Sequence, residues 1–120
     1  MFCGIGVNVS QTDEELPTDT PAPAGSLATV LGRAPNRAEL LASLLEILEH
    51  RYDMWRRSGL APLLDELEAR NVLRGAHVKI GGESGNAGLI APDGRLTLDR
   101  DDGTTILVGS GEVEAVQVSG

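Results

Sequence analysis

Apolar and polar residues alternate at the start of the chain and predict a β-strand over residues 2–9. Its odd-numbered positions are apolar and include Cys3, which we expect to be a buried structural thiol. The opposite side carries Gly4, Gly6 and Asn8, so it is nearly bare of side chains. Because glycine weakens a strand interior, its presence suggests a close approach to the backbone at this point.

A polar segment with three prolines, residues 10–25, follows the predicted strand and indicates a surface loop. Ser26 is a residue type that begins helices, and Gly32 is one that ends them. Together they predict a short helix over the sequence LATVL between them.

A long amphipathic helix is predicted next, from the capping-box spacing of Asn36 and Glu39 to about Ser58. A further helix is expected to begin near Pro62, because proline suits the first helical turn. Both helices are predicted to bury an apolar stripe. In the long helix the stripe is Leu41, Leu44, Leu45, Leu48, Tyr52 and Trp55, and in the shorter one it is Leu63, Leu64 and Leu67.

The remainder of the chain consists of short β-prone runs separated by turn-forming residues. PDG at 92–94 and DDG at 101–103 are typical of hairpin turns, and residues 81–86 are also predicted to form a turn. Five strands within about fifty residues predict a small SH3-like barrel, whose closure would remove the sheet edges. The predicted strands are His77–Ile80, Ala87–Ile90, Arg95–Leu98, Thr104–Val108 and Glu112–Val118.

These elements predict an α+β fold with two parts. Residues 1–71 would form a partial α/β unit of one strand and about three helices, and residues 72–120 would form the barrel. A lone strand leaves its backbone groups unpaired. The barrel is also shorter than the roughly 70 to 80 residues at which a single core becomes dependable. Both shortfalls indicate missing protein.

The charge and the single cysteine restrict the classes of function. The chain has 18 acidic and 10 basic side chains, a net charge of −8, and its basic residues are scattered. Nucleic-acid binding is therefore disfavoured. The sequence contains no membrane-spanning run and no secretory signal, and its only cysteine fits a reducing compartment. We predict a cytoplasmic protein without nucleic-acid or membrane partners.

No complete catalytic constellation or metal-binding motif occurs, so we assign no catalytic and no metal-ligating residue. The glycine pair lacks the third glycine of a dinucleotide site and the Gly-Lys-Ser/Thr of a P-loop. Two interpretations of the glycine side stay open. It packs beneath another backbone, or it accepts a flat ligand with the amide of Asn8 at the rim.

The order of the motifs resembles one known family. GIGVNVSQ is followed by a proline-bearing loop, by AGSLATVLG, by a leucine-rich helical segment, and by a β module with PDGRLTL and SGEVEAV. This order covers essentially the whole chain and resembles the C-terminal half of a bacterial biotin protein ligase. The matching part is the end of the catalytic domain plus the SH3-like C-terminal domain. Ser26 matches the serine of the family's ATSL loop only loosely.

The resemblance implies ATP- and Mg²⁺-dependent activation of biotin to biotinyl-5′-AMP, followed by transfer to a lysine of biotin carboxyl carrier protein. It also implies that Gly4, Gly6 and Asn8 line the adenylate site. The family's arginine- and glycine-rich loop and its KWPND lysine do not occur in this sequence. We therefore expect the chain to be inactive without an N-terminal ligase half. The alternative hypothesis is a non-catalytic SH3-like protein-interaction module.

Overall fold

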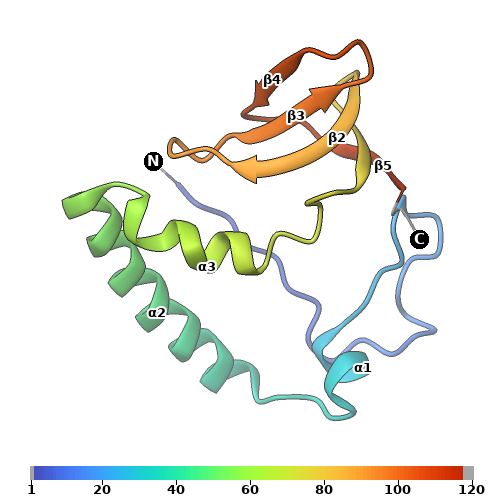
Figure 1. Cartoon of the computed structure of the whole chain (residues 1–120). Coiled ribbons are helices and arrows are strands. Elements are labelled where there is room, and N and C mark those ends of the chain that lie inside the picture. Colours follow the sequence, from blue (N-terminus) through green and yellow to red (C-terminus); the bar gives the residue numbers. More distant parts are fainter. Residues whose placement is uncertain (1, 118–120) are drawn as a thin grey trace. The chain divides into compact units, whose positions relative to one another are not determined.

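The computed structural model describes residues 2–117 and contains three α-helices and five β-strands in that range (Figure 1). The chain divides into two compact units, residues 1–50 and 51–120. The sequence-based division between residues 71 and 72 separates the end of a catalytic domain from a barrel. It is a different kind of boundary from the division into compact units, and it stays a prediction. No helix in the described range is long and apolar enough to cross a bilayer.

The first helix, α1 (Leu27–Leu31), has the ends that its sequence predicts. The backbone N–H of Thr29 donates to the Ser26 hydroxyl oxygen over 3.1 Å, and the Thr29 hydroxyl oxygen accepts from the N–H of Ser26 over 3.0 Å. Gly32 ends the helix with φ of 73°, a left-handed conformation that glycine adopts without a steric cost. This five-residue helix is therefore fixed mainly by its caps.

The long helix α2 (Arg37–Ser58) also has its predicted bounds. The backbone N–H of Glu39 donates to Asn36 Oδ1 over 3.0 Å, and Gly59 follows the helix with φ of 66°. The expected burial of its apolar stripe is wrong for this structure, because no residue of α2 is buried. Leu41 is 55% exposed and Trp55 is 47% exposed. The helix forms because its signals are local, whereas burial of its stripe needs packing partners that residues 2–117 do not provide.

The predicted strand at residues 2–9 is wrong. The segment is extended, but the structure assigns it no strand, and it is drawn in Figure 1 without an arrow. Only Val9 is buried, and Cys3 is exposed rather than buried as expected. The physical reason is that a strand exists only through hydrogen bonds to a neighbour. The described residues provide no neighbouring strand for this segment.

After α2, a 3₁₀ turn, η1 (Ala61–Leu63), leads into α3 (Leu64–Ala69). A helix near Pro62 is therefore confirmed, with a tighter first turn than predicted. The expected burial of its three leucines is wrong: none is buried, and Leu67 is 40% exposed.

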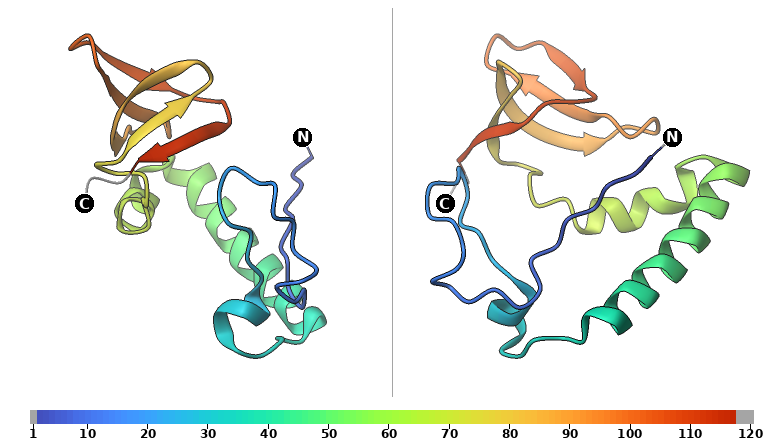
Figure 2. Two further views of the ribbon diagram at one scale, coloured as in Figure 1. Left: turned by 90° about the vertical axis from the view of Figure 1, so that its right-hand side faces the viewer. Right: turned by 180° about the vertical axis from the view of Figure 1, so that it is seen from behind.

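The five strands form one antiparallel sheet in the order β4-β3-β2-β1-β5 (Figure 2). The predicted turn at 81–86 is wrong in extent, because β2 already begins at Glu83 and only Gly81 and Gly82 connect it to β1. The predicted loss of sheet edges is also wrong, because no pairing joins β4 to β5 within residues 2–117. The strands are β1 (His77–Ile80), β2 (Glu83–Ile90), β3 (Leu96–Arg100), β4 (Thr105–Val108) and β5 (Val113–Gln117).

A small aliphatic core holds the sheet together. Val78 and Leu98 are fully buried at its centre. Glu68 of α3 and Asn71, two residues after the helix, contact the C-terminal end of β2: the Glu68 carboxylate accepts from the N–H of Ile90, and Asn71 Nδ2 donates to the carbonyl of Gly88 over 3.2 Å. The other core residues are Ala76, Ile80 and Ala87.

Candidate functional site

The glycine-bearing segment of the first unit has two different sides. A Cβ atom built on Gly4 or Gly6 would meet no atom within 4 Å, so this side of the backbone is open. Side chains alternate along an extended chain, so the odd-numbered residues point the other way. There they line an apolar groove of about 550 Å³ together with the first turns of α2. Its apolar lining includes Ile5, Val7, Val9, Leu40, Leu41 and Leu44.

Asn8 lies where this segment joins the rest of the unit. Its carbonyl accepts from the N–H of Leu27 over 2.9 Å, and its Nδ2 donates to the carbonyl of Gly25 over 3.2 Å. The amide group has one further N–H and an acceptor oxygen. Neither has a partner among the described residues. Asn8 is exposed, so it can anchor the backbone and still offer polar atoms to a ligand.

The base of the loop at residues 10–25 is closed by neighbouring contacts. Ser26 is 3% exposed, and its hydroxyl donates to the carbonyl of Gln11 over 2.7 Å. The N–H of Ala28 donates to the carbonyl of Val9 over 2.9 Å. Ser26 therefore positions the loop and begins α1. The spacing of Ser26 and Thr29 indicates the cap, whereas no sequence signal indicates the contacts across the loop.

Cations are scarce in the first unit. Residues 1–50 contain two arginines, Arg33 and Arg37, against seven acidic residues. Arg37 Nη2 donates to the hydroxyl oxygen of Ser10 over 2.9 Å. The unit therefore carries a net negative charge on its own, which opposes the binding of a polyphosphate.

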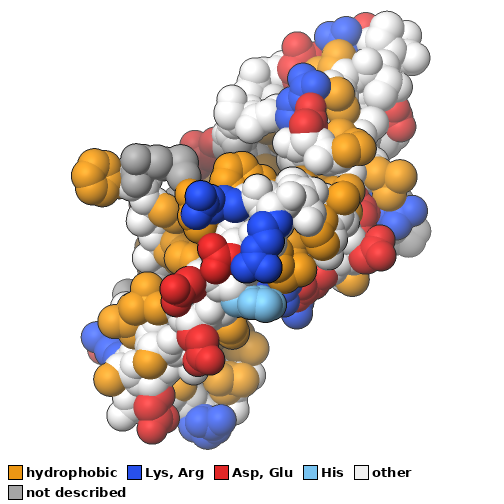
Figure 3. All heavy atoms as spheres, turned by 90° about the vertical axis from the view of Figure 1, so that its left-hand side faces the viewer, with side chains coloured by type: hydrophobic (Ala, Val, Ile, Leu, Met, Phe, Trp, Pro, Cys, Tyr) orange, Lys and Arg blue, Asp and Glu red, His pale blue; other side chains and the backbone are white. Residues whose placement is uncertain are grey.

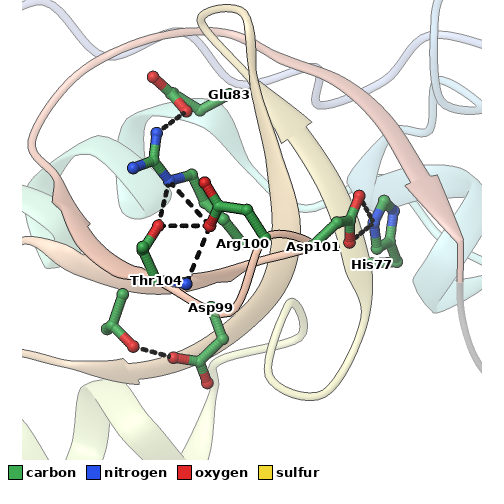
Figure 4. Close-up of polar contacts among 8 residues, drawn as sticks. His77, Glu83, Asp99, Arg100, Asp101 and Thr104 are labelled. Carbon is green, nitrogen blue, oxygen red and sulfur yellow. Dashed lines mark hydrogen bonds and ion pairs between the residues drawn. The ribbon is translucent and has the colours of Figure 1, made fainter.

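The sheet of the second unit carries a polar cluster (Figure 4). Arg100 donates to Glu83 over 3.1 Å and to Thr104 over 2.9 Å, and His77 Nε2 lies 3.0 Å from the Asp101 carboxylate. These contacts connect neighbouring strands and the β3–β4 turn. They include no nucleophile beside a general base.

A second polar cluster joins the end of α2 to α3. The Glu66 carboxylate receives hydrogen bonds from Arg51 and Arg70, and those from Arg51 contribute most to lowering the pKa of Glu66 to about 2. This group stays ionised over the ordinary pH range and serves as a structural anion. No group of three His, Cys, Asp or Glu within residues 2–117 is arranged to hold a metal ion.

The chain is similar to known proteins over almost its whole length, although no family model matches it. A biotin--[acetyl-CoA-carboxylase] ligase of Mycobacterium tuberculosis is 36% identical over 115 residues. The match covers 92% of this chain but 41% of that protein. The chain therefore spans less than half the length of the curated relative that it matches.

Two solved structures of a biotin protein ligase from Aquifex aeolicus share the fold. The apo structure has a TM-score of 0.74 at 21% identity, covering 90% of this chain and 49% of that one. The structure in complex with biotin and ATP has a TM-score of 0.75 at 22% identity, covering 93% and 48%. At these identities the likeness establishes the fold alone. In sequence the chain is similar to part of a biotin--[acetyl-CoA-carboxylase] ligase, and in fold it is similar to about half of a biotin protein ligase.

Proposed function

We propose that the chain supplies the C-terminal part of a biotin protein ligase. In that role it takes part in activating biotin with ATP to biotinyl-5′-AMP and in transferring biotin to a lysine of biotin carboxyl carrier protein. The observation that carries the proposal is the 36% identity to the M. tuberculosis ligase across 92% of this chain. Because that match spans 41% of the relative, the activity is proposed only for the chain together with the remaining part of a ligase.

Gly4, Gly6 and Asn8 are the residues that we assign to the adenylate site. The open glycine side supports this assignment, because a flat ligand can lie directly on the backbone where no Cβ atom intervenes. The free N–H and oxygen of the Asn8 amide would donate to or accept from the ligand. Their contribution would be positioning, which brings the reacting carboxylate and α-phosphate together.

The charge balance supports the second part of the proposal, that this chain alone is inactive. Forming an acyl adenylate requires cationic groups that neutralise the phosphates. Arg33 and Arg37 are the only Lys or Arg residues in the first unit, and seven acidic residues oppose them. The described residues do not fit Mg²⁺ as a resident ion. We therefore propose that Mg²⁺ arrives with the ATP phosphates and that the cations come from the rest of the ligase.

Biotin-dependent exchange of pyrophosphate into ATP tests the proposal directly. The chain alone is expected to give no exchange. Co-expression with the part of the M. tuberculosis ligase outside the match is expected to restore exchange and biotin transfer. Continued inactivity of a purified complex would count against the proposal and would favour a non-catalytic SH3-like interaction module. Exchange by the chain alone would refute the need for a second part.

Matched glycine variants of the restored complex test the adenylate site. Gly6→Ala is expected to weaken ATP-dependent exchange, because the added methyl group lies on the side assigned to the ligand. Gly25→Ala is the control, since its Cβ would make only an ordinary 3.8 Å contact with Thr29. Equal activity of the two variants would remove Gly6 from the proposed site.

A further inference from the structure

We propose that Ser26 is a positioning residue of the adenylate site, which acts on the nucleotide through the amide of Asn8 without touching the nucleotide itself. The inference rests on the proposed function, because it concerns the same site. It adds a residue to that site and explains what holds the one polar side chain assigned to it.

The first turn of α1 is joined to the segment that carries Asn8. The backbone N–H groups at the start of a helix have no partner within the helix. Here those of Leu27 and Ala28 donate to the carbonyls of Asn8 and Val9, each over 2.9 Å. The position of the Asn8 backbone therefore follows the position of the first turn of α1.

The Ser26 hydroxyl joins the same two parts of the chain from a buried position. Ser26 is 3% exposed. Its oxygen accepts from the N–H of Thr29 over 3.1 Å, and the hydroxyl donates to the carbonyl of Gln11 over 2.7 Å. One hydroxyl thus begins α1 and also holds the chain three residues after Asn8. Alanine at this position would leave the Thr29 N–H and the Gln11 carbonyl without these bonds.

The residue before Ser26 determines how the Asn8 amide is turned. Asn8 Nδ2 donates to the carbonyl of Gly25 over 3.2 Å. Because a carbonyl oxygen can only accept a hydrogen bond, the amide must present Nδ2 to it. The second N–H and the oxygen of this exposed amide then have fixed places for a ligand. Since Gly25 is bonded directly to Ser26, a shift of Ser26 moves the carbonyl that sets this orientation.

A neutral amide depends on being held in place more than a cation does. Over the face drawn in Figure 3, Lys and Arg side chains lie among acidic and hydrophobic ones and form no continuous basic patch. In the first unit, two arginines are outnumbered by seven acidic residues. A neutral hydrogen-bonding group contributes through geometry, so its contribution is largest when its orientation is fixed before the ligand binds. The contacts of Ser26 and Gly25 supply this fixed orientation.

Exchange of pyrophosphate into ATP by the restored complex tests the role, with Ser26→Ala in the full chain. Loss of one neutral hydrogen bond weakens binding by up to about tenfold, so the KM for ATP is expected to rise by about this factor while kcat changes little. A merely structural loss would reduce the fraction of active complex, which lowers the apparent kcat and leaves the KM for ATP unchanged. Ser26→Thr keeps the hydroxyl and is expected to restore the KM. An unchanged KM in Ser26→Ala would overturn the proposal.

Thr29→Val is the matched control on the same helix. The Thr29 hydroxyl accepts from the N–H of Ser26 over 3.0 Å and donates to the carbonyl of Ser26 over 2.9 Å. Its loss weakens the start of α1 but does not remove the bond from Ser26 to Gln11. The KM for ATP should therefore stay within about twofold of the original value. An equal rise in Thr29→Val and Ser26→Ala would overturn the proposal, because any weakening of the helix start would then suffice.

A double-mutant cycle tests whether Ser26 acts through Asn8. Asn8→Ala should raise the KM for ATP by itself. Adding Ser26→Ala to Asn8→Ala should raise it by less than about twofold more, because the group that Ser26 positions is already absent. Effects that multiply in full would show that the two residues act independently and would overturn the proposal.

The side-chain amide of Asn8 also provides a measurement that does not depend on activity. Nuclear magnetic resonance of the ¹⁵N-labelled full chain follows its two N–H protons. Ser26→Ala is expected to move these signals to the shifts of a free asparagine, whereas Thr29→Val should leave them in place. Such a shift in a chain whose restored complex shows no exchange would uphold the positioning of Asn8 and overturn the proposed function. Unchanged Asn8 signals in Ser26→Ala would overturn the inference, whether or not the complex is active.

Discussion

Replacing Gly85 by alanine tests how closely β2 and β3 approach each other. Gly85 is buried and pairs with Arg100 across the two strands. A Cβ at residue 85 would lie 2.7 Å from the carbonyl carbon of Asp99 and 2.8 Å from Cα of Arg100, with the Asp99 oxygen nearer still. Real Cβ atoms essentially never approach other atoms within 3.0 Å. Because the three nearest atoms all belong to the backbone of β3, the two strands must separate.

The expected cost follows from overpacking. Inserting a methyl group into a packed site costs about 1–3 kcal/mol. We expect the upper part of this range, because no flexible side chain can move aside. Alanine also lowers the conformational entropy of the unfolded chain, which raises the free energy of unfolding by about 0.4–1 kcal/mol. The free energy of unfolding should therefore fall by about 2 kcal/mol. For a unit of this size that corresponds to a Tm lower by roughly 8–16 °C.

Thermal unfolding followed by circular dichroism measures this difference, and Gly88→Ala is the matched control. Gly88 lies in the same strand, but its Cβ would meet Thr97 at 3.5 Å, an ordinary contact distance. Gly88→Ala should change the free energy of unfolding by less than about 0.5 kcal/mol. If Gly85→Ala unfolds at the same temperature as Gly88→Ala, the close approach of the two strands is not a constraint and the reasoning is wrong.

Three further predictions concern single polar groups. Glu68→Ala should lower the free energy of unfolding by about 1–3 kcal/mol in urea, because the N–H of Ile90 loses its acceptor; Glu68→Gln, which keeps an acceptor oxygen, should recover part of this. Ser26→Ala should destabilise α1 by about 1 kcal/mol, seen as faster hydrogen exchange there, and unchanged exchange would contradict the capping role. The pKa of Glu66 is lowered from 4.5 to about 2, chiefly by Arg51, so its contribution to stability is complete above pH 4.5 and is lost as pH falls towards 2. Urea unfolding between these pH values should show a smaller loss for Glu66→Gln than for the original chain, and equal losses would contradict the assignment.

The helices could be predicted from the sequence because their signals are local. Ser26 and Gly32 delimit α1, and Asn36 caps α2, within a turn of the residues that they contact. The hairpin turns after β2 and β3 could also be predicted from the sequence. Gly94 has φ of 89° and Gly103 has φ of 83°, conformations that their turns require and that glycine adopts readily.

The start of β2 could not be predicted, because it depends on distant partners. Residues 81–86 contain three glycines and a polar stretch, which locally indicate a turn. In the structure, Ser84 pairs with Lys79, and Gly85 pairs with Val78 and with Arg100. The glycine at 85 permits a close approach of two strands rather than a turn. Composition alone does not distinguish these two uses of glycine.

The candidate site likewise combines residues that could be predicted from the sequence with contacts that could not. Gly4, Gly6 and Asn8 could be selected from the sequence, because glycine within an apolar alternation is unusual. Their assignment to an adenylate still stands as a proposal. The bond from Asn8 to Gly25 could not be anticipated, since 17 residues separate the two and no pattern connects them.

The strand predicted over residues 2–9 is absent from the structure, but the pattern that predicted it matches a set of exposed apolar residues. Alternation at residues 2–9 and the leucine stripe of α2 are patterns typical of segments that bury one side. Ile5, Val7 and Leu41 are nevertheless half exposed in the structure. A sequence pattern reflects the burial for which a segment is suited, whereas the structure shows only the contacts made among residues 2–117. The mismatch falls on the segment without a pairing strand, in a chain that spans 41% of its relative.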